Sequence, residues 1–211
     1  MAPSRAGSFS STERRNIAIY IIGIMFYKIG LESFNGAIVS LAADRFEAAH
    51  TFGKIGALNG LNQAMQVVGS ILVGPLVKAF PARSVMTTAI LIFGFISVLF
   101  LIIDAGTGGK TKIANGGQVK YGKWDPDGLF PLYMIAGISH GMVELIRRII
   151  PCDIVGGDVK KLRKMDAIVH ILYEAAGTGG AILSVKMIEI LGNNFSSLIT
   201  PPLFAFAGLT W

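Results

Sequence analysis

The sequence predicts an all-α protein, a polytopic bundle of transmembrane helices, and three observations lead to this fold class. Apolar residues make up 52% of the chain and charged residues only 15%, whereas soluble domains carry about a quarter charged residues. The apolar residues gather in long stretches, and about 20 of them in a row are needed to cross the hydrocarbon core of a bilayer. Several of these stretches also contain charged residues, which are costly there and therefore indicate function.

Six helices are expected in chain order, after a polar tail at residues 1–15 that is rich in Ser and Arg. They are predicted at about 16–42, 57–80, 84–103, 129–155, 167–191 and 197–211. The first stretch is too long for the apolar region of a signal peptide, and no small-residue cleavage site follows it, so we expect it to be retained. Since the last stretch stops at Trp211, residues 16–211 are predicted to form a six-helix half-bundle truncated in its sixth helix.

The basic residues at the helix ends predict the orientation, because Lys and Arg are enriched in cytoplasmic loops. Arg5, Arg14 and Arg15 precede the first helix, and the densest basic run lies at 160–164. Both are expected on the cytoplasmic side. The segment 104–128 is rich in Gly, Lys and Asp and lacks an apolar period, so it is predicted to be an outer loop, although its four lysines oppose the rule. We expect a multi-pass integral membrane protein with a cytoplasmic N-terminus.

Small residues mark where helices are expected to touch. Gly56 and Gly60 form a G-x-x-x-G pair in the second helix, which Gly69 and Gly74 extend, and the fifth helix contains Gly177, Gly179 and Gly180. Helices in lipid associate through close backbone approach, which small residues permit. We therefore predict helix contacts at these glycines.

Polar residues inside the first and fourth helices suggest a site. Lys28 and Glu32 are one turn apart and share a face, as do His140, Glu144 and Arg147. Counted along each helix, Lys28 and Glu144 lie at similar depth, so we predict an ion pair or a shared polar cavity. Two interpretations stay open at this point. One is a neutralising bridge that holds the bundle together, and the other is a site for a polar or ionic substrate or a proton.

A second set of charges is expected nearer the cytoplasmic side. Arg147 and Arg148 of the fourth helix and Glu174 of the fifth fall at comparable depth. They predict a bridge between the two helices with a structural or gating role. The three histidines lie in different segments and there is a single cysteine, so neither a metal site, a cofactor nor an internal disulfide is predicted.

The turn between the second and third helices carries a family resemblance. The stretch Gly-Pro-Leu-Val-Lys-Ala-Phe-Pro-Ala-Arg that ends at Arg83 resembles the signature loop of the major facilitator superfamily, Gly-x-Leu-x-Asp-Arg-x-Gly-Arg-Arg. Gly74, Leu76 and Arg83 match, while Lys78 stands where the family has Asp and Pro81 where it has Gly. The resemblance implies that Lys78 and Arg83 belong to an inner gate.

A second stretch, 141–177, is similar to the fourth helix, inner loop and fifth helix of fungal members of this superfamily whose substrate is unassigned. The resemblance covers essentially the whole chain, as an N-terminal half. In that family the first and fourth helices line the central cavity. This implies a cavity lined by Lys28, Glu32, His140 and Glu144. The sequence motifs typical of proton-coupled members and of drug antiporters are matched here only at one glycine and at one Gly-Gly pair. The resemblance therefore implies neither proton coupling nor drug export.

The resemblance implies a secondary-transporter half that moves a small-molecule solute by alternating access. Its partners would be the lipid bilayer and either a missing C-terminal half or a second copy. The alternative is a small multispan membrane protein that acts as an oligomeric channel or assembly factor. An enzyme is not expected, because the chain has no H-E-x-x-H or paired-Asp motif, and its one G-x-S-x-G string, at 137–141, falls inside the predicted fourth helix. Nucleic-acid binding is not expected either, because the basic residues cluster at helix ends as topology signals do.

Overall fold

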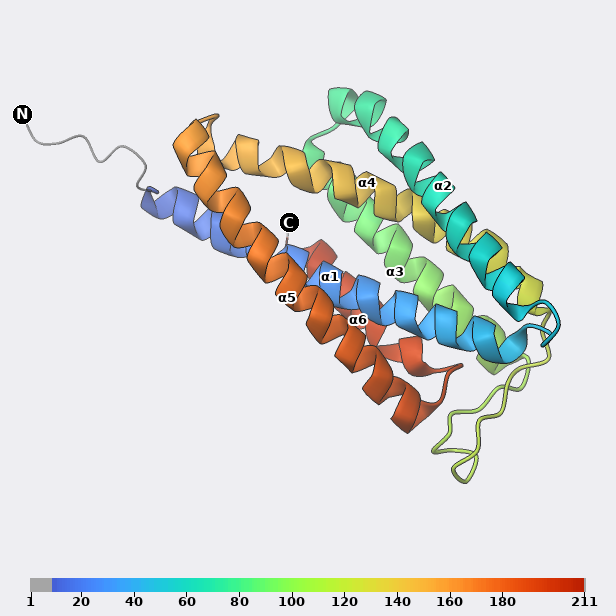
Figure 1. Ribbon diagram of the computed structural model, residues 1–211. Helices are drawn as coiled ribbons and strands as arrows, with labels where there is room; N and C mark the ends of the chain where they lie inside the picture. Colours follow the sequence, from blue (N-terminus) through green and yellow to red (C-terminus); the bar gives the residue numbers. More distant parts are fainter. Residues whose placement is uncertain (1–8, 211) are drawn as a thin grey trace, which may run out of the picture.

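A computed structural model describes residues 9–210, and this part of the chain is an all-α bundle without β-strands (Figure 1). Its long helices are α1 (Ser11–Arg45), α2 (Thr51–Ala79), α3 (Ala82–Gly106), α4 (Leu129–Val155), α5 (Val159–Leu191) and α6 (Thr200–Leu209). Two short 3-10 helices, η1 (Pro126–Gly128) and η2 (Ser196–Ile199), precede α4 and α6. The first five long helices are long and apolar enough to cross a membrane. The predicted fold class is therefore confirmed, while Arg5 and Trp211 lie outside the described residues.

α1, α2 and α5 begin earlier than predicted, and polar side chains cap two of them, α1 and α5. At the start of α1, the Glu13 backbone N–H donates to the Ser10 hydroxyl and the Ser10 N–H donates to the Glu13 carboxylate. This capping box makes residues 11–15 of the predicted tail helical. The Asp158 carboxylate accepts from two N–H groups in the first turn of α5. The basic run at 160–164, expected in a loop, therefore forms the first turns of that helix.

The pattern of helix–helix contacts is the same for the first three long helices as for the last three. α1 lies along α5 and α2 along α4, while α3 packs on α4 and α6, and α1 on α6. Exchanging α1, α2 and α3 with α4, α5 and α6 leaves this pattern unchanged, since each contact maps onto another of the set. α1 and α4 run in opposite directions (Figure 1). The bundle thus has the packing order of an inverted three-helix repeat.

The glycine prediction is correct for Gly69 of α2, described below, and for two positions of α5. A Cβ added to Gly180 would lie 2.6 Å from a backbone carbonyl oxygen of α1, and one added to Gly177 would lie 2.8 Å from a side-chain carbon of that helix. It is wrong for Gly56, Gly60, Gly74 and Gly179, where an added Cβ would meet nothing within 4 Å. Glycine spacing permits close approach but does not determine which side of a helix meets a neighbour.

Close contact between α2 and α4 uses Gly69, which was among the predicted positions, and two glycines of α4 that were not. A Cβ on Gly69, Gly137 or Gly141 would collide with a backbone carbonyl of the facing helix. Beside them, the buried Asn62 side chain donates to the Tyr133 carbonyl at 2.7 Å. Small residues and one amide therefore let α2 and α4 approach along their backbones, as in other membrane bundles.

The predicted outer loop is irregular but ordered, because its polar groups converge on Asp104. This buried carboxylate accepts from the Gly122 N–H at 2.9 Å, the Trp124 indole N–H at 2.7 Å and the Asn194 amide at 2.9 Å. Arg45 donates to the carbonyls of Gly122 and Trp124, and its guanidinium lies 4.8 Å from the Trp124 ring centroid. The loop is thereby tied to the ends of α1 and α3.

A neighbouring contact attaches the same loop to the end of α1. The Tyr121 hydroxyl donates to the Asp44 carboxylate at 2.5 Å, and the Asn193 amide donates to the same oxygen. Burial, together with the hydrogen bond to Asp44, raises the pKa of the Tyr121 hydroxyl. Tyr121 therefore stays protonated and keeps donating across the whole neutral range.

Candidate functional site

Six polar side chains from α1, α4 and α5 meet about midway along these helices. Five of them were expected from the sequence, and the sixth is an aromatic residue of α5. We refer to them as the polar cluster, which consists of Lys28, Glu32, His140, Glu144, Arg147 and Tyr173. The cluster joins the two helices predicted to line a cavity to a third that was not.

On α1, Lys28 and Glu32 pair with each other. The Lys28 ammonium donates to the Glu32 carboxylate at 2.5 Å, and the two side chains are 14% and 32% exposed. The ammonium also lies 4.7 Å from the ring centroid of Tyr173 on α5, within the range of a cation–π contact. α1 thus presents one charge pair to the neighbouring helix.

On α4, Glu144 is the centre of a second group. Its carboxylate accepts from the Arg147 Nε at 2.8 Å and from the Tyr173 hydroxyl, and the His140 Nε2 lies 3.8 Å away. The Arg147 guanidinium lies 4.3 Å from the Tyr173 ring centroid. The i, i+3 and i, i+4 spacing brings the three α4 side chains to one face.

Tyr173 connects the two groups, although the sequence analysis did not select it as a site residue. Its ring contacts both Lys28 and Arg147, and its hydroxyl bonds Glu144. A signal existed in the sequence, since Tyr173 shares a helix face with Gly177 and Gly180 at spacings of four and seven. Those glycines meet α1, so the tyrosine on the same face also had to point inward.

Lys28 and Glu144 were predicted to form an ion pair or to share a polar cavity, and the structure does not contain the ion pair. Each finds its partner on its own helix, Glu32 for Lys28 and Arg147 for Glu144. Equal depth places two groups at one level of the membrane, but the rotation of each helix about its axis decides which groups touch. α1 packs mainly along α5 and α4 along α2, so a side chain of α5 stands between the two charges.

The predicted bridge from Arg147 or Arg148 to Glu174 is also wrong. Arg147 pairs with Glu144, and both Arg148 and Glu174 are exposed, without an ion pair within residues 9–210. Glu174 directly follows Tyr173, so it points about 100° away around the axis of α5. The residue that faces α4 is therefore the tyrosine.

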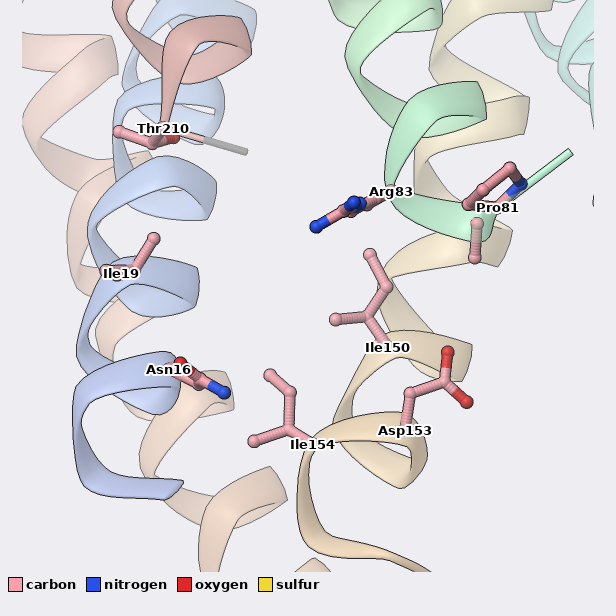
Figure 2. Close-up of a pocket in the computed structure, with 9 residues that line it drawn as sticks. Asn16, Ile19, Pro81, Arg83, Ile150, Asp153, Ile154 and Thr210 are labelled. Carbon is pink, nitrogen blue, oxygen red and sulfur yellow. The ribbon is translucent and has the colours of Figure 1, made fainter. Parts of the chain in front are cut away.

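The two inner-gate candidates are likewise exposed, and neither forms an ion pair in the described chain. Lys78 lies in the last turn of α2 and Arg83 in the first turns of α3. Arg83 lines a cavity at this end of the bundle (Figure 2). The two residues are thus far along the helices from the polar cluster.

A buried hydroxyl near the cluster is left without a partner. Tyr27 of α1 is fully buried, and its hydroxyl makes no hydrogen bond in the described structure. It lies within electrostatic range of Tyr173, Glu144 and Arg147. An unpaired buried hydroxyl of this kind is costly.

The cluster contains two cations, two carboxylates, an imidazole and a phenol, so its formal charges balance when His140 is neutral. Such a set can bind a polar or ionic solute by exchanging internal pairs for contacts to the solute. Within residues 9–210 no group of three His, Cys, Asp or Glu side chains is arranged to hold a metal ion. Comparisons with protein-family models, curated proteins and solved structures found no match. The function is therefore inferred from this geometry.

Proposed function

We propose that the chain forms one six-helix half of a secondary transporter of the major facilitator kind, which moves a small polar or ionic solute across a membrane by alternating access. The observation that carries the proposal is the polar cluster midway along helices of membrane-crossing length. Ionisable groups at that depth are expensive and are found where substrates or ions pass. In transporters built from repeats the substrate site also lies near the midplane, between the repeats.

Two further features support this proposal. The packing order repeats after three helices with opposite direction, as in the nested repeats of each six-helix half of these transporters. The charged side chains of the cluster are 14–32% exposed. Since charges at midplane depth avoid lipid, they are expected to face a polar passage closed by a second half-bundle or a second copy of the chain.

We further propose that the N-terminus and the α4–α5 turn face the cytoplasm. The basic residues at 160–164 lie at this end of the bundle, as do Arg14 and Arg15. The Glu13 carboxylate accepts from the Lys161 ammonium at 2.8 Å, which joins the two segments. The start of α1 and the start of α5 therefore lie on the same side of the membrane. The positive-inside rule favours the cytoplasmic side.

Cysteine labelling at Glu32 tests alternating access. In a Cys152→Ser background, Glu32→Cys would be exposed to a membrane-impermeant maleimide in sealed vesicles of either orientation. We expect labelling from both sides, because alternating access opens the cluster to each side in turn. Val68→Cys is the control, since Val68 is 40% exposed on the apolar flank of α2, and we expect no labelling there from either side.

Labelling of Glu32→Cys from one side only, or from neither, would contradict the transporter proposal. A closed structural cluster predicts the second result. The alternative of an oligomeric channel predicts a different one, namely a sustained ionic current when the protein is reconstituted in a planar bilayer. An alternating-access transporter has no continuous pore and is expected to give no such current.

A further inference from the structure

The loop between α3 and α4 contains a short hairpin, residues 108–123, which carries four lysines and no acidic residue. We refer to it as the lysine hairpin. The chain reverses direction at Gly116 and Gly117, whose φ angles of 67° and 91° are accessible mainly to glycine. Its two arms meet where the Lys110 N–H donates to the Lys120 carbonyl at 2.8 Å. The hairpin therefore has a defined conformation of its own.

The lysine hairpin projects from the end of the bundle at which α1 and α3 end, beside the end of α5 (Figure 1). Arg45, the last residue of α1, holds the loop there through the Gly122 carbonyl. The first turns of α1 and Thr210 lie together at the other end of the bundle. Neither end of the described chain is therefore near the hairpin.

Buried contacts fix the hairpin to the helix ends. The Asn194 side chain is fully buried, and its amide donates to the Lys110 carbonyl at 3.3 Å and to the Lys120 carbonyl at 2.8 Å. The Lys112 N–H donates to the Leu191 carbonyl, at the last residue of α5, at 2.8 Å. The hairpin thus keeps one position relative to the helices.

Two lysines of the hairpin lie directly opposite each other. Lys110 and Lys120 form an antiparallel bridge, so their side chains leave the backbone on the same face, and both are exposed. Like charges in this arrangement repel and destabilise the pairing. Within residues 9–210, no ion pair includes a lysine of the hairpin. Asp127 and Glu189, two acidic residues at this end, instead pair with lysines of α2 and α5. The fold thus holds two cations together without supplying an anion between them.

An apolar side chain accompanies these cations. Ile113, near the tip of the hairpin, is 68% exposed. The Lys112 ammonium next to it donates to the Glu189 carbonyl in the last turn of α5 at 3.2 Å. The end of a helix that crosses a bilayer lies in the zone of the lipid head groups. Cations beside an exposed apolar side chain at this level are the composition of segments that bind membrane surfaces.

We propose that the lysine hairpin binds the head groups of anionic phospholipids in the leaflet at this end of the bundle. Lys110 and Lys120 share the lipid phosphate, and Ile113 lies against the glycerol and the upper acyl chains. Phosphatidylcholine binds less well, because its own quaternary ammonium neutralises its phosphate. Four lysines in a predicted outer loop oppose the positive-inside rule, and lipid binding gives them a role other than setting topology. The interaction requires only that the helices lie in a bilayer, and it is independent of transport.

Quenching by labelled lipids at one position of the hairpin tests the proposal. In a Cys152→Ser background, Ala114→Cys would carry a fluorophore beside Ile113, since Ala114 is exposed. The protein would be placed in phosphatidylcholine nanodiscs with increasing fractions of phosphatidylglycerol or phosphatidylcholine that bear a nitroxide at the top of one acyl chain. We expect phosphatidylglycerol to reach half-maximal quenching at a mole fraction roughly fivefold or more lower, because one lysine near an anionic lipid surface favours binding by about this factor. Equal quenching by the two lipids would overturn the proposal.

Variants of single lysines test whether the facing pair is responsible. Lys120→Gln is expected to lower the preference for phosphatidylglycerol about fivefold, whereas Lys120→Arg keeps the charge and should retain it. Lys123→Gln is the matched control, because Lys123 is an exposed lysine of the same hairpin outside the bridged pair, and its effect should stay below about twofold. The preference is a ratio between two lipids and does not depend on the yield of folded protein. Equal losses in Lys120→Gln and Lys123→Gln would indicate general surface attraction and refute the paired site, and a loss in Lys120→Arg would contradict the role of the charge.

Soluble anions distinguish a lipid from free phosphate. Inorganic phosphate carries the anion alone, and glycerophosphoglycerol carries the head group without acyl chains. We expect either to reduce quenching by labelled phosphatidylglycerol only at concentrations at least about tenfold above that of the labelled lipid, because neither places an acyl chain beside Ile113. Sodium chloride at equal ionic strength controls for screening. Displacement by inorganic phosphate at a concentration equal to that of the labelled lipid would overturn the lipid assignment.

Discussion

Replacing Glu144 by Gln tests whether the charges of the polar cluster stabilise the fold by neutralising one another. The carboxylate accepts from Arg147 and Tyr173 and lies beside His140. Glutamine keeps the size of the side chain and an oxygen that accepts from Tyr173, but it removes the negative charge. Arg147, whose side chain is 15% exposed, would then be left without its counter-ion.

The expected cost follows from this burial. Removing one partner of a buried ion pair costs about 3–5 kcal/mol, because the other charge stays desolvated. Since Glu144 and Arg147 keep 24% and 15% exposure, we expect the lower limit, about 3 kcal/mol. At roughly 2–4 °C per kcal/mol for a chain of this size, the melting temperature should fall by roughly 6–12 °C.

Thermal unfolding of the purified protein, followed by tryptophan fluorescence, measures the effect. Glu189→Gln is a matched control, because Glu189 also pairs at i, i+3, with Lys186 at 2.7 Å, but both side chains are more than half exposed. Such a surface pair contributes about 0.5 kcal/mol or less. The double variant Glu144→Gln with Arg147→Gln should recover most of the loss. Equal melting of Glu144→Gln and Glu189→Gln would refute the reasoning, and so would a double variant less stable than the single one.

Three further outcomes are expected. Gly180→Leu should lower the melting temperature in detergent, because its Cβ would meet the backbone of α1, whereas Gly60→Leu should leave it unchanged; equal melting of the two would contradict the packing. Asp104→Ala removes the acceptor that holds the loop 107–128, so limited trypsin digestion should cut that loop faster, and an unchanged rate would argue against this role. In a cysteine-free background, Lys161→Cys should be labelled by an impermeant reagent only from the cytoplasmic side and Lys112→Cys only from the outside, and the reverse result would show an inverted topology.

The local part of the site could be predicted from the sequence. Lys28 and Glu32 pair, and His140, Glu144 and Arg147 share one face, because residues three or four apart on a helix are neighbours whatever surrounds them. The partners across helices were not predicted. The pairs Lys28 to Glu144 and Arg147 to Glu174 fail, since a depth count contains no information about rotation around the helix axis.

The sequence by itself determined that this is an all-α chain of membrane-length helices with charges in their middle, because apolar run length and helical period are local properties. Only the tertiary structure decided that α1 pairs with α5 and α2 with α4, and that Tyr173 stands between the charges of α1 and α4. It also decided that Gly180 meets a neighbour while Gly60 does not. These facts depend on how each helix is turned toward the others, and that choice comes from the packing of the whole bundle.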